Sequence, residues 1–353
     1  MPIPSAVDEI TPAWLSEVLA ADIGAVEVVD AHSGTTGRAK IRIGSGAGAG
    51  LPETLFVKLQ PFDEEQRAFL RMVGLGVAEA KVYAAVGDAL PVRAPHVWHA
   101  SCDDDGSFVM VLEDLDAAGC RFATPDDPDV LAVAASLVDE LAKLHAAFWD
   151  QDLPWLGTHA LSPGDSDEAR QRMAMGAAIV GSAVDQFASE LPAEFRQLAE
   201  VYIARNRDIG ALWNEGERTL IHGDTHIGNL FVDAGRTGFY DWAVASHHPG
   251  MRDVAYFLCN SLPTEIRRAE EGALVARYRA GLAEHGITLD ATLAHEQYRL
   301  FSVYSWIAAT TTAAMGSRWQ PVEVGRRAME RTTQAIIDLD VLGLLSELLR
   351  TKT

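Results

Sequence analysis

The spacing of hydrophobic positions changes near residue 115, and this change divides the chain into two parts. Before it, apolar residues alternate with polar ones or form short β-branched runs, which predicts strands. Helical spacing occurs there only around residues 63–73 and 77–87. The first part is therefore predicted to be a small antiparallel sheet with one or two helices. Its strands are predicted from VEVVDA (26–31), AKIRI (39–43), TLFVKLQ (54–60) and FVMVLEDL (108–115).

Beyond residue 115 the spacing becomes that of amphipathic helices. Leu137, Leu141, Leu144 and Phe148 recur at i, i+4, i+7 and i+11, which places them on one helical face. Strand signals appear only near residues 230 and 240. The predicted fold class is α+β, with a strand-rich domain over residues 1–114 and a larger helical domain over residues 115–353. Further Ala-rich helical patterns cover residues 166–190, 192–215, 264–285, 293–315 and 321–350.

Composition and charge exclude several classes of function. A chain of 353 residues with 48% hydrophobic residues can form one large or two medium domains. A net charge of −21 argues against a broad nucleic-acid surface and against adsorption to anionic membranes. No run of about 20 apolar residues predicts a membrane span. Cys102, Cys120 and Cys259 lack metal or disulfide spacing, and the N-terminus does not resemble a secretory signal, so a cytoplasmic location is expected.

The stretch HGDTHIGNLF (222–231) concentrates candidate chemistry just before a strand. It opens the segment NLFVDAGRTGFYD (229–241), which reads as two short strands joined by turn residues. A hairpin centred on Gly235 would place Asn229 opposite Asp241, with Cβ atoms roughly 5 Å apart. An amide oxygen and a carboxylate at that spacing can hold one divalent cation. Asp224 is predicted to face the same place from the preceding loop.

Hard oxygen ligands that are few in number favour Mg²⁺, which takes its remaining ligands from water and phosphates. A carboxylate beside such a metal can accept a proton from an attacking hydroxyl. This combination is what phosphoryl transfer requires. The histidines of the stretch, His222 and His226, are interpreted first as loop supports that bond the backbone, and second as metal ligands.

The same residues resemble a known superfamily. HGDTHIGN is similar to the HGDxHxxN signature of the aminoglycoside phosphotransferase and choline kinase superfamily, and YDW (240–242) resembles its second metal-binding motif. LFVKLQP and FVMVLEDL are most similar to the ecdysteroid-kinase-like branch and its bacterial relatives, and LAKLHAAFWD (141–150) resembles the helix after the hinge. The resemblance implies a bilobal protein-kinase-like fold, with a small antiparallel-sheet N-lobe and a larger helical C-lobe.

The resemblance also implies an activity and roles for the catalytic loop. The chain would be an ATP- and Mg²⁺-dependent kinase that phosphorylates a hydroxyl of a small molecule, as a monomer or homodimer. Asp224 would be the catalytic base, and Asn229 and Asp241 would bind Mg²⁺. Asp253, in MRDVAYFL, resembles the buried aspartate that braces the loop.

Further roles are implied for the nucleotide side. Lys58 would contact the ATP phosphates and pair with Glu79, for which Glu64 and Glu65 are the alternatives. The backbone of two hinge residues would meet adenine, and two glycines of SGTTG (33–37) would let a loop cover the phosphates. These four residues are Glu113, Leu115, Gly34 and Gly37.

Two other functions remain open at this stage. The residues His222, Asp224, His226, Asn229, Asp241 and His247 could form a two-metal phosphoesterase site. Alternatively, the chain could bind a nucleotide without catalysis. The presence of Asp224, Asn229 and Asp241, which catalysis would need, argues against this. The acceptor itself has no motif that identifies it.

Overall fold

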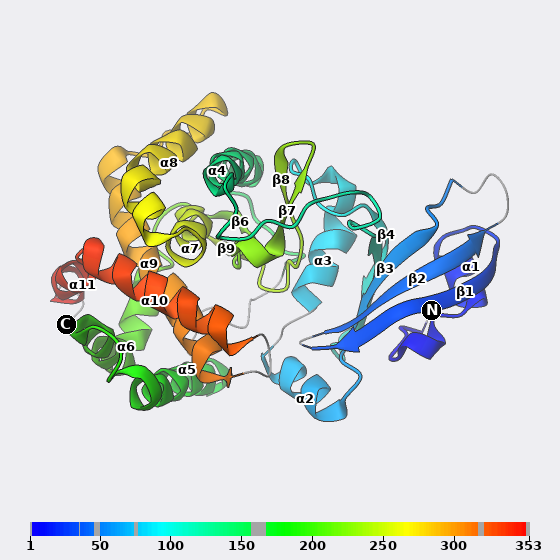
Figure 1. Cartoon of the computed structure of the whole chain (residues 1–353), viewed down its shortest axis with the longest axis horizontal. Helices are drawn as coiled ribbons and strands as arrows, with labels where there is room; N and C mark the ends of the chain where they lie inside the picture. The colour runs from blue at the N-terminus through cyan, green and yellow to red at the C-terminus, as the bar shows by residue number, and fades with distance from the viewer. Residues whose placement is uncertain are drawn as a thin grey trace. The chain divides into compact units, whose positions relative to one another are not determined.

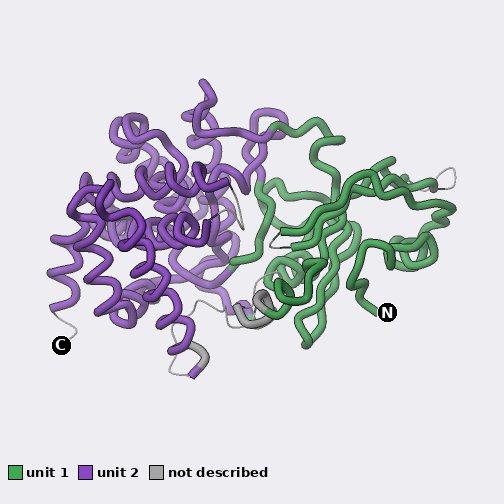
Figure 2. Tube along the Cα trace, turned by 60° about the horizontal axis from the view of Figure 1, so that its bottom comes forward, with its two compact units in different colours: residues 1–121, 154–159, 239–245 green, residues 122–153, 160–238, 246–353 purple. Residues whose placement is uncertain are grey.

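The structure, a computed structural model, describes residues 2–34, 36–45, 50–73, 77–156, 167–316 and 321–350. The chain divides into two compact units (Figure 2). Unit 1 comprises Met1–Arg121 together with Pro154–His159 and Phe239–Ala245. Unit 2 comprises Phe122–Leu153, Ala160–Gly238 and Ser246–Thr353.

Unit 1 is built on a five-stranded antiparallel sheet with the order β1-β2-β3-β5-β4 (Figure 1). The four strands predicted from alternation are all present. The fifth strand, β4, was not predicted, because all of its residues are half-buried and give no alternating pattern. The strands are β1 (Ile23–Ser33), β2 (Gly37–Ser45), β3 (Thr54–Leu59), β4 (Val97–Cys102) and β5 (Phe108–Glu113). The helices are α1 (Pro12–Val18), α2 (Glu64–Val73) and α3 (Val77–Ala85), with short 3₁₀ turns at Val7–Glu9 and Gly87–Ala89.

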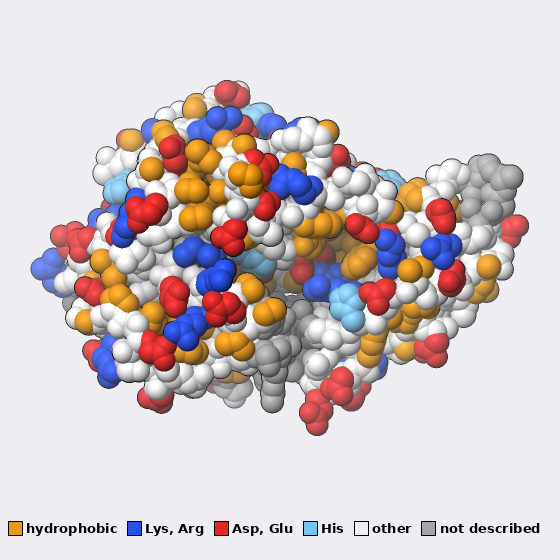
Figure 3. All heavy atoms as spheres, in the orientation of Figure 1, with side chains coloured by type: hydrophobic (Ala, Val, Ile, Leu, Met, Phe, Trp, Pro, Cys, Tyr) orange, Lys and Arg blue, Asp and Glu red, His pale blue; other side chains and the backbone are white. Residues whose placement is uncertain are grey.

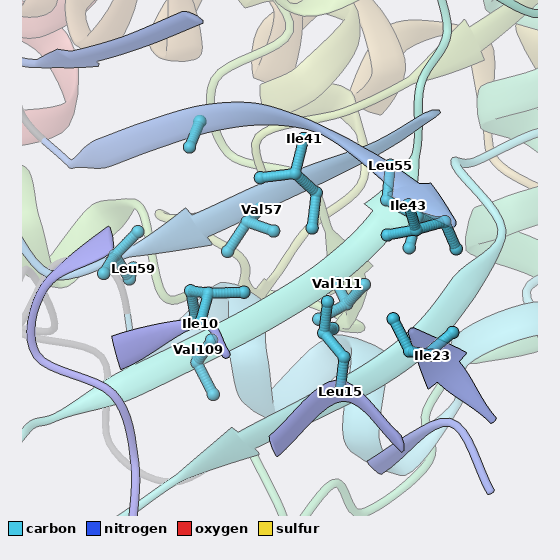
Figure 4. Packing of buried hydrophobic residues seen from close by; sticks show 11 residues of the cluster. Ile10, Leu15, Ile23, Ile41, Ile43, Leu55, Val57, Leu59, Val109 and Val111 are labelled. Carbon is cyan, nitrogen blue, oxygen red and sulfur yellow. The ribbon is translucent and has the colours of Figure 1, made fainter. Parts of the chain in front are cut away.

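One face of this sheet carries a hydrophobic cluster that α1 covers (Figure 4). Alternate residues of β3, Leu55, Val57 and Leu59, are fully buried in it, as expected for a strand with one face in a core. Leu15 from α1 is buried against them. On β3 the residue between Val57 and Leu59 is Lys58, so its side chain leaves the strand on the opposite face.

Unit 2 is mostly helical, as predicted. In Figure 1 its helices run from green to red. The predicted patterns correspond closely to observed helices except at residues 321–350, where one predicted helix is two. Asp340 has a φ of 46° between them, which a continuing α-helix does not tolerate. The helices are α4 (Val130–Ala147), α5 (Asp167–Phe187), α6 (Ala193–Leu212), α7 (Met251–Ser261), α8 (Thr264–Glu284), α9 (Ala291–Ala314), α10 (Val322–Asp338) and α11 (Val341–Arg350).

Helix α7 was missed by the pattern analysis. All eleven of its residues are buried, the polar Arg252, Asp253 and Asn260 included, so its polar positions do not mark a solvent-facing side. It packs against α9 and α10, so it is a central helix of unit 2. Residues on α7 therefore contact unit 2 on every side, which bears on the site below.

Two small sheets carry the HGDTHIGNLF region. Strand β6 (Thr219–Ile221) pairs with β9 (Ser246–His248), and β7 (Leu230–Asp233) pairs with β8 (Arg236–Phe239). A 3₁₀ turn, Ile227–Asn229, leads into β7.

The β7–β8 turn corrects one prediction. Its two residues, Ala234 and Gly235, have φ of 49° and 80°, the pattern of a type I′ hairpin turn. Such a turn is centred between the two residues, so the prediction of a centre on Gly235 is wrong by half a residue. The direct strand pairing of Asn229 with Asp241 therefore does not follow from the hairpin.

The predicted α+β class, with an N-terminal antiparallel sheet followed by a mostly helical region, is confirmed. No helix in the described part of the chain is long and apolar enough to cross a membrane. On the face of unit 2 drawn in Figure 3, acidic and basic side chains are intermingled, with no broad patch of one sign.

Candidate active site

The ammonium group of Lys58 is buried between two carboxylates of unit 1. Its Nζ contacts Oε2 of Glu79, on α3, and lies 2.8 Å from Oδ1 of Asp241. Burial on its own lowers the pKa of Lys58, but the carboxylates of Asp241 and Glu79 outweigh it, so the pKa is raised and the group stays charged. Of the three glutamates weighed from the sequence, the structure pairs Glu79 with Lys58. Glu64 and Glu65 are exposed on α2.

Asp241 follows β8 with a φ of 65°, a left-handed conformation that aspartate tolerates better than most residues. This local strain turns its carboxylate toward Lys58 and, at 3.6 Å, toward a guanidinium nitrogen of Arg38. Two cations and two carboxylates thus share one cluster, in which Lys58 and Glu79 are buried while Arg38 and Asp241 are partly exposed. Burial and the charge of Asp241 raise the pKa of the neighbouring Tyr240 to about 12.

The predicted hinge follows β5 in unit 1. The carboxylate of Glu113 accepts two hydrogen bonds from Arg93, at 2.8 and 2.7 Å, and one from the backbone N–H of His96. The carbonyl of Leu115 accepts from Cys120, whereas its own N–H bonds no group in the described part of the chain.

The two predicted loop glycines lie at the β1–β2 turn. Gly37 begins β2, opposite Ser33, and a Cβ there would lie 2.6 Å from the carbonyl oxygen of Gln60. Gly34 has open space around its Cα. Gly37 is thus required by packing, while Gly34 leaves the backbone of the loop unobstructed.

In unit 2, the loop after β6 orders Asp224 and Asn229. The Nδ2 of Asn229 donates to Oδ2 of Asp224 and to its backbone carbonyl, both at 2.9 Å. Because an amide nitrogen has only two hydrogens, both are used, and the Asn229 Oδ1 remains as an acceptor or metal ligand. The carboxylate of Asp224 is about one third exposed and reaches solvent.

The two histidines support this loop. Nδ1 of His222 accepts from the backbone N–H of Asp224 at 3.3 Å, and Nδ1 of His226 accepts from Gly228 at 3.1 Å. Nε2 of His226 lies 3.6 Å from Oδ2 of Asp224. These are the backbone contacts that the loop-support interpretation requires.

Asp253, on α7, stabilises the same loop by hydrogen bonds to its backbone. Its two carboxylate oxygens accept from the backbone N–H of His222 at 2.7 Å and of Gly223 at 2.8 Å. Nε2 of His145 lies 3.3 Å away, while Nδ1 of His145 pairs with the hydroxyl of Tyr278. Burial alone raises the pKa of Asp253, but the interactions with His145 and the loop outweigh it and lower the pKa.

Further residues around this loop were not found from the sequence. Tyr256, one turn after Arg252 on α7, bonds the carboxylate of Asp224, and burial raises its pKa well above the usual value. The hydroxyl of Tyr304, on α9, donates to the carbonyl of Gly223 at 3.3 Å. Tyr256 lies within MRDVAYFL but was not singled out there, and Tyr304 lies on α9 outside any quoted motif, so only the fold brings them to the loop.

The predicted metal-cluster alternative gains no structural support. Among the described residues, no group of three or more His, Cys, Asp or Glu side chains is arranged to hold a metal ion. His247 lies on β9, and burial lowers its pKa. Cys102, Cys120 and Cys259 form no disulfide.

A family model described as "Phosphotransferase enzyme family" matches residues 28–288, which is most of the chain. A comparison with curated protein sequences found no match.

Several solved structures share the fold. A proposed aminoglycoside phosphotransferase from Ralstonia eutropha has a TM-score of 0.57 and 14% identity, covering 93% of this chain and 97% of that one. A choline kinase from Streptococcus pneumoniae has a TM-score of 0.52 and 14% identity, covering 94% and 99%. A proposed fructosamine-3-kinase from Thermobifida fusca has a TM-score of 0.51 and 18% identity, covering 92% and 99%. At these identities the likeness shows a common kinase-like fold.

Proposed function

The chain belongs to the phosphotransferase enzyme family, and from that premise we propose that it is an ATP- and Mg²⁺-dependent kinase of a small hydroxyl compound. The observation that carries the proposal is the buried Lys58–Glu79–Asp241 cluster. A lysine that is charged, buried and fixed by two carboxylates is expensive to maintain, and structures keep such groups mainly for function. Holding phosphate oxygens is the use that the family implies.

On this proposal, unit 1 binds the nucleotide. Lys58 contacts the α- and β-phosphates, and Glu79 keeps its ammonium group in place. The backbone of Glu113 and Leu115 binds adenine, for which the unpaired N–H of Leu115 is suited. The loop that contains Gly34 and Gly37 covers the phosphates.

The residues of unit 2 act on the acceptor. The carboxylate of Asp224 takes the proton of the attacking hydroxyl, and Asn229 and Tyr256 orient it by hydrogen bonds. Asp253 keeps the loop in the geometry that transfer requires. We assign Asp224 as base and Asp253 as a positioning residue.

The donor set suits Mg²⁺. Asn229 offers a hard amide oxygen because both of its N–H groups are used elsewhere, and Asp241 offers a carboxylate. We propose these two as the metal ligands on the strength of the motif. When bound, the metal supplies charge neutralisation for the phosphates.

The acceptor class is less constrained. Fold relatives are described as acting on aminoglycosides, choline and fructosamine, which are all small hydroxyl compounds. We keep the narrower resemblance to the ecdysteroid-kinase-like branch as a proposal that rests on LFVKLQP and FVMVLEDL alone. Three cysteines that form no disulfide favour a reducing compartment such as the cytoplasm.

The test compares nucleotide binding with turnover. We expect ATP to raise the melting temperature in the presence of Mg²⁺, and slow ADP release with water as acceptor, which aminoglycosides, amino sugars, choline-like alcohols or sterols accelerate. Asp224→Asn should keep the ATP-dependent shift and lose turnover by at least about 10²-fold. The matched control is Asp185→Asn, an exposed aspartate of α5.

Two results would contradict the proposal. Undiminished ADP release by Asp224→Asn would remove that residue from the chemistry. The absence of any ATP-dependent melting shift, together with a bound transition metal, would instead favour a metal-dependent hydrolase.

A further inference from the structure

Arg252 is a buried cation that stacks on an aromatic ring. It lies in the first turn of α7 and is only 3% exposed. Its guanidinium carbon lies 3.6 Å from the centre of the Tyr304 ring, and its Nε has no hydrogen-bond partner. Within the described part of the chain, no acidic side chain forms an ion pair with it.

A second buried arginine of the protein, in contrast to Arg252, is paired with carboxylates. Arg267, on α8, is 1% exposed and pairs with two acids, Glu271 at 2.6 Å and Asp338. Removing a guanidinium from water costs much more than stacking on one aromatic ring returns. Arg252 therefore holds a buried charge that no carboxylate in the described part of the chain balances, which points to an anionic ligand.

The surroundings of Arg252 lead to the catalytic loop. Arg252 and Tyr256 are four residues apart on α7, so their side chains lie next to each other on one face. Tyr256 bonds the carboxylate of Asp224, and Tyr304 bonds the carbonyl of Gly223. Both aromatic neighbours of Arg252 thus touch the loop that carries the proposed base.

Further aromatic rings pack around Tyr304, next to Arg252. The ring of Trp213, on α6, meets that of Tyr304 edge-on, with ring centroids 5.7 Å apart. The ring centroids of Tyr256 and Tyr304 are 5.6 Å apart. Trp213 and Tyr304 are half-buried, so part of each ring is accessible. A cation beside partly accessible aromatic rings suits a ligand with an anionic end and an apolar body.

We propose that Arg252 binds an anionic group, a carboxylate or a phosphate, of the acceptor whose hydroxyl is phosphorylated. The inference rests on the proposed kinase function and narrows it to hydroxy acids or phosphorylated alcohols, as opposed to cationic amino alcohols. In the transfer, the acceptor oxygen bonds the γ-phosphorus, its proton passes to Asp224, and the bond to the bridging oxygen breaks to release ADP. Arg252 takes no part in these bond changes and determines specificity.

The experiment measures melting of the full chain with small probes in matched pairs. Mandelate is compared with neutral mandelamide, and glycerol 3-phosphate with glycerol, with choline as a cationic probe. The variants are Arg252→Met, which removes the charge, and Arg252→Lys, which retains it. Arg196→Met, at an exposed position of α6, is the control.

We expect at least one of the two anions, mandelate or glycerol 3-phosphate, to raise the melting temperature of the wild type, Arg252→Lys and Arg196→Met. Neither anion should raise that of Arg252→Met. The neutral and cationic probes should have no effect on any of them. A response to mandelate identifies a carboxylate site, and a response to glycerol 3-phosphate a phosphate site. Without ligand, Arg252→Met should melt at or above the wild-type temperature, because it removes an unbalanced buried charge.

The proposal is overturned if neither anion stabilises the wild type, or if Arg252→Met responds as strongly as the wild type. It is also overturned if choline stabilises the wild type more than the anions do. Failure of the kinase function would be seen separately, as the loss of any ATP- and Mg²⁺-dependent shift in every variant. Because the anion response is measured without nucleotide, the two failures are distinguishable.

Discussion

Replacing Asp253 by asparagine should destabilise unit 2 and misplace the loop that follows β6. The aspartate accepts two backbone hydrogen bonds, from His222 at 2.7 Å and from Gly223 at 2.8 Å, and a third contact from His145 at 3.3 Å. Asparagine has the same shape but only one acceptor oxygen. Its NH₂ group would therefore oppose one of the two backbone N–H donors in a fully buried place.

The magnitude follows from these contacts. A hydrogen bond to a charged group contributes about 1.5–3 kcal/mol, and an unsatisfied buried donor costs about 1–3 kcal/mol. Asp253→Asn should thus lower the free energy of unfolding by about 3 kcal/mol. For a unit of this size, the melting temperature should fall by roughly 6–12 °C. Urea unfolding followed by far-ultraviolet circular dichroism measures this loss, with Asp185→Asn as the control.

The pH dependence gives the same prediction a second test. The pKa of Asp253 is lowered in the folded protein, so its stabilisation is fully present above its unfolded value of about 4 and is lost as the pH falls through the folded value. The gap between wild type and Asp253→Asn should be constant above about pH 4 and close below it. A loss smaller than about 1 kcal/mol at neutral pH, or a gap independent of pH down to acid unfolding, would refute the reasoning.

Three further variants test unit 1. Glu79→Gln removes the closest charge that holds the buried ammonium of Lys58, so kcat/KM for ATP should fall by about 10²-fold while circular dichroism stays unchanged; an unaltered kcat/KM would reject the positioning role. Gly37→Ala should destabilise by about 1–3 kcal/mol in thermal melts, because its Cβ would collide with the Gln60 carbonyl, whereas Gly34→Ala should be nearly neutral. Equal effects of the two alanines would contradict the packing argument.

The local sequence patterns predicted the fold where an element has one buried face and one solvent-exposed face. Strands such as β3 alternate because one side meets the α1 cluster, and most helices of unit 2 have an amphipathic stripe. Helix α7 is buried on all sides and strand β4 is half-buried throughout, so neither has the buried and exposed faces on which the pattern analysis depends. Turn detail also failed: the positive φ of Ala234 sets the hairpin centre, and alanine gives no sign of that conformation.

For the candidate site, the sequence predicted the residues that belong to short motifs. The structure shows the contact of Lys58 with Glu79 and the hydrogen bond from Asn229 to Asp224. Their catalytic roles stay predictions. Arg252 and Tyr304 could not be predicted, because they meet only when α7 packs on α9. The absence of a counter-ion is a property of the folded surroundings and has no trace in the sequence.

The membership of Phe239–Ala245 in unit 1 affects how the protein is made. Asp241, which shares the charge of Lys58, is synthesised roughly 120 residues after Arg121, a delay on the order of ten seconds at ribosomal speed. Until then the nascent sheet carries a lysine with only one of its two acids. A fragment that stops at Arg121 would keep this defect permanently, so unit 1 cannot be excised by cutting the chain once.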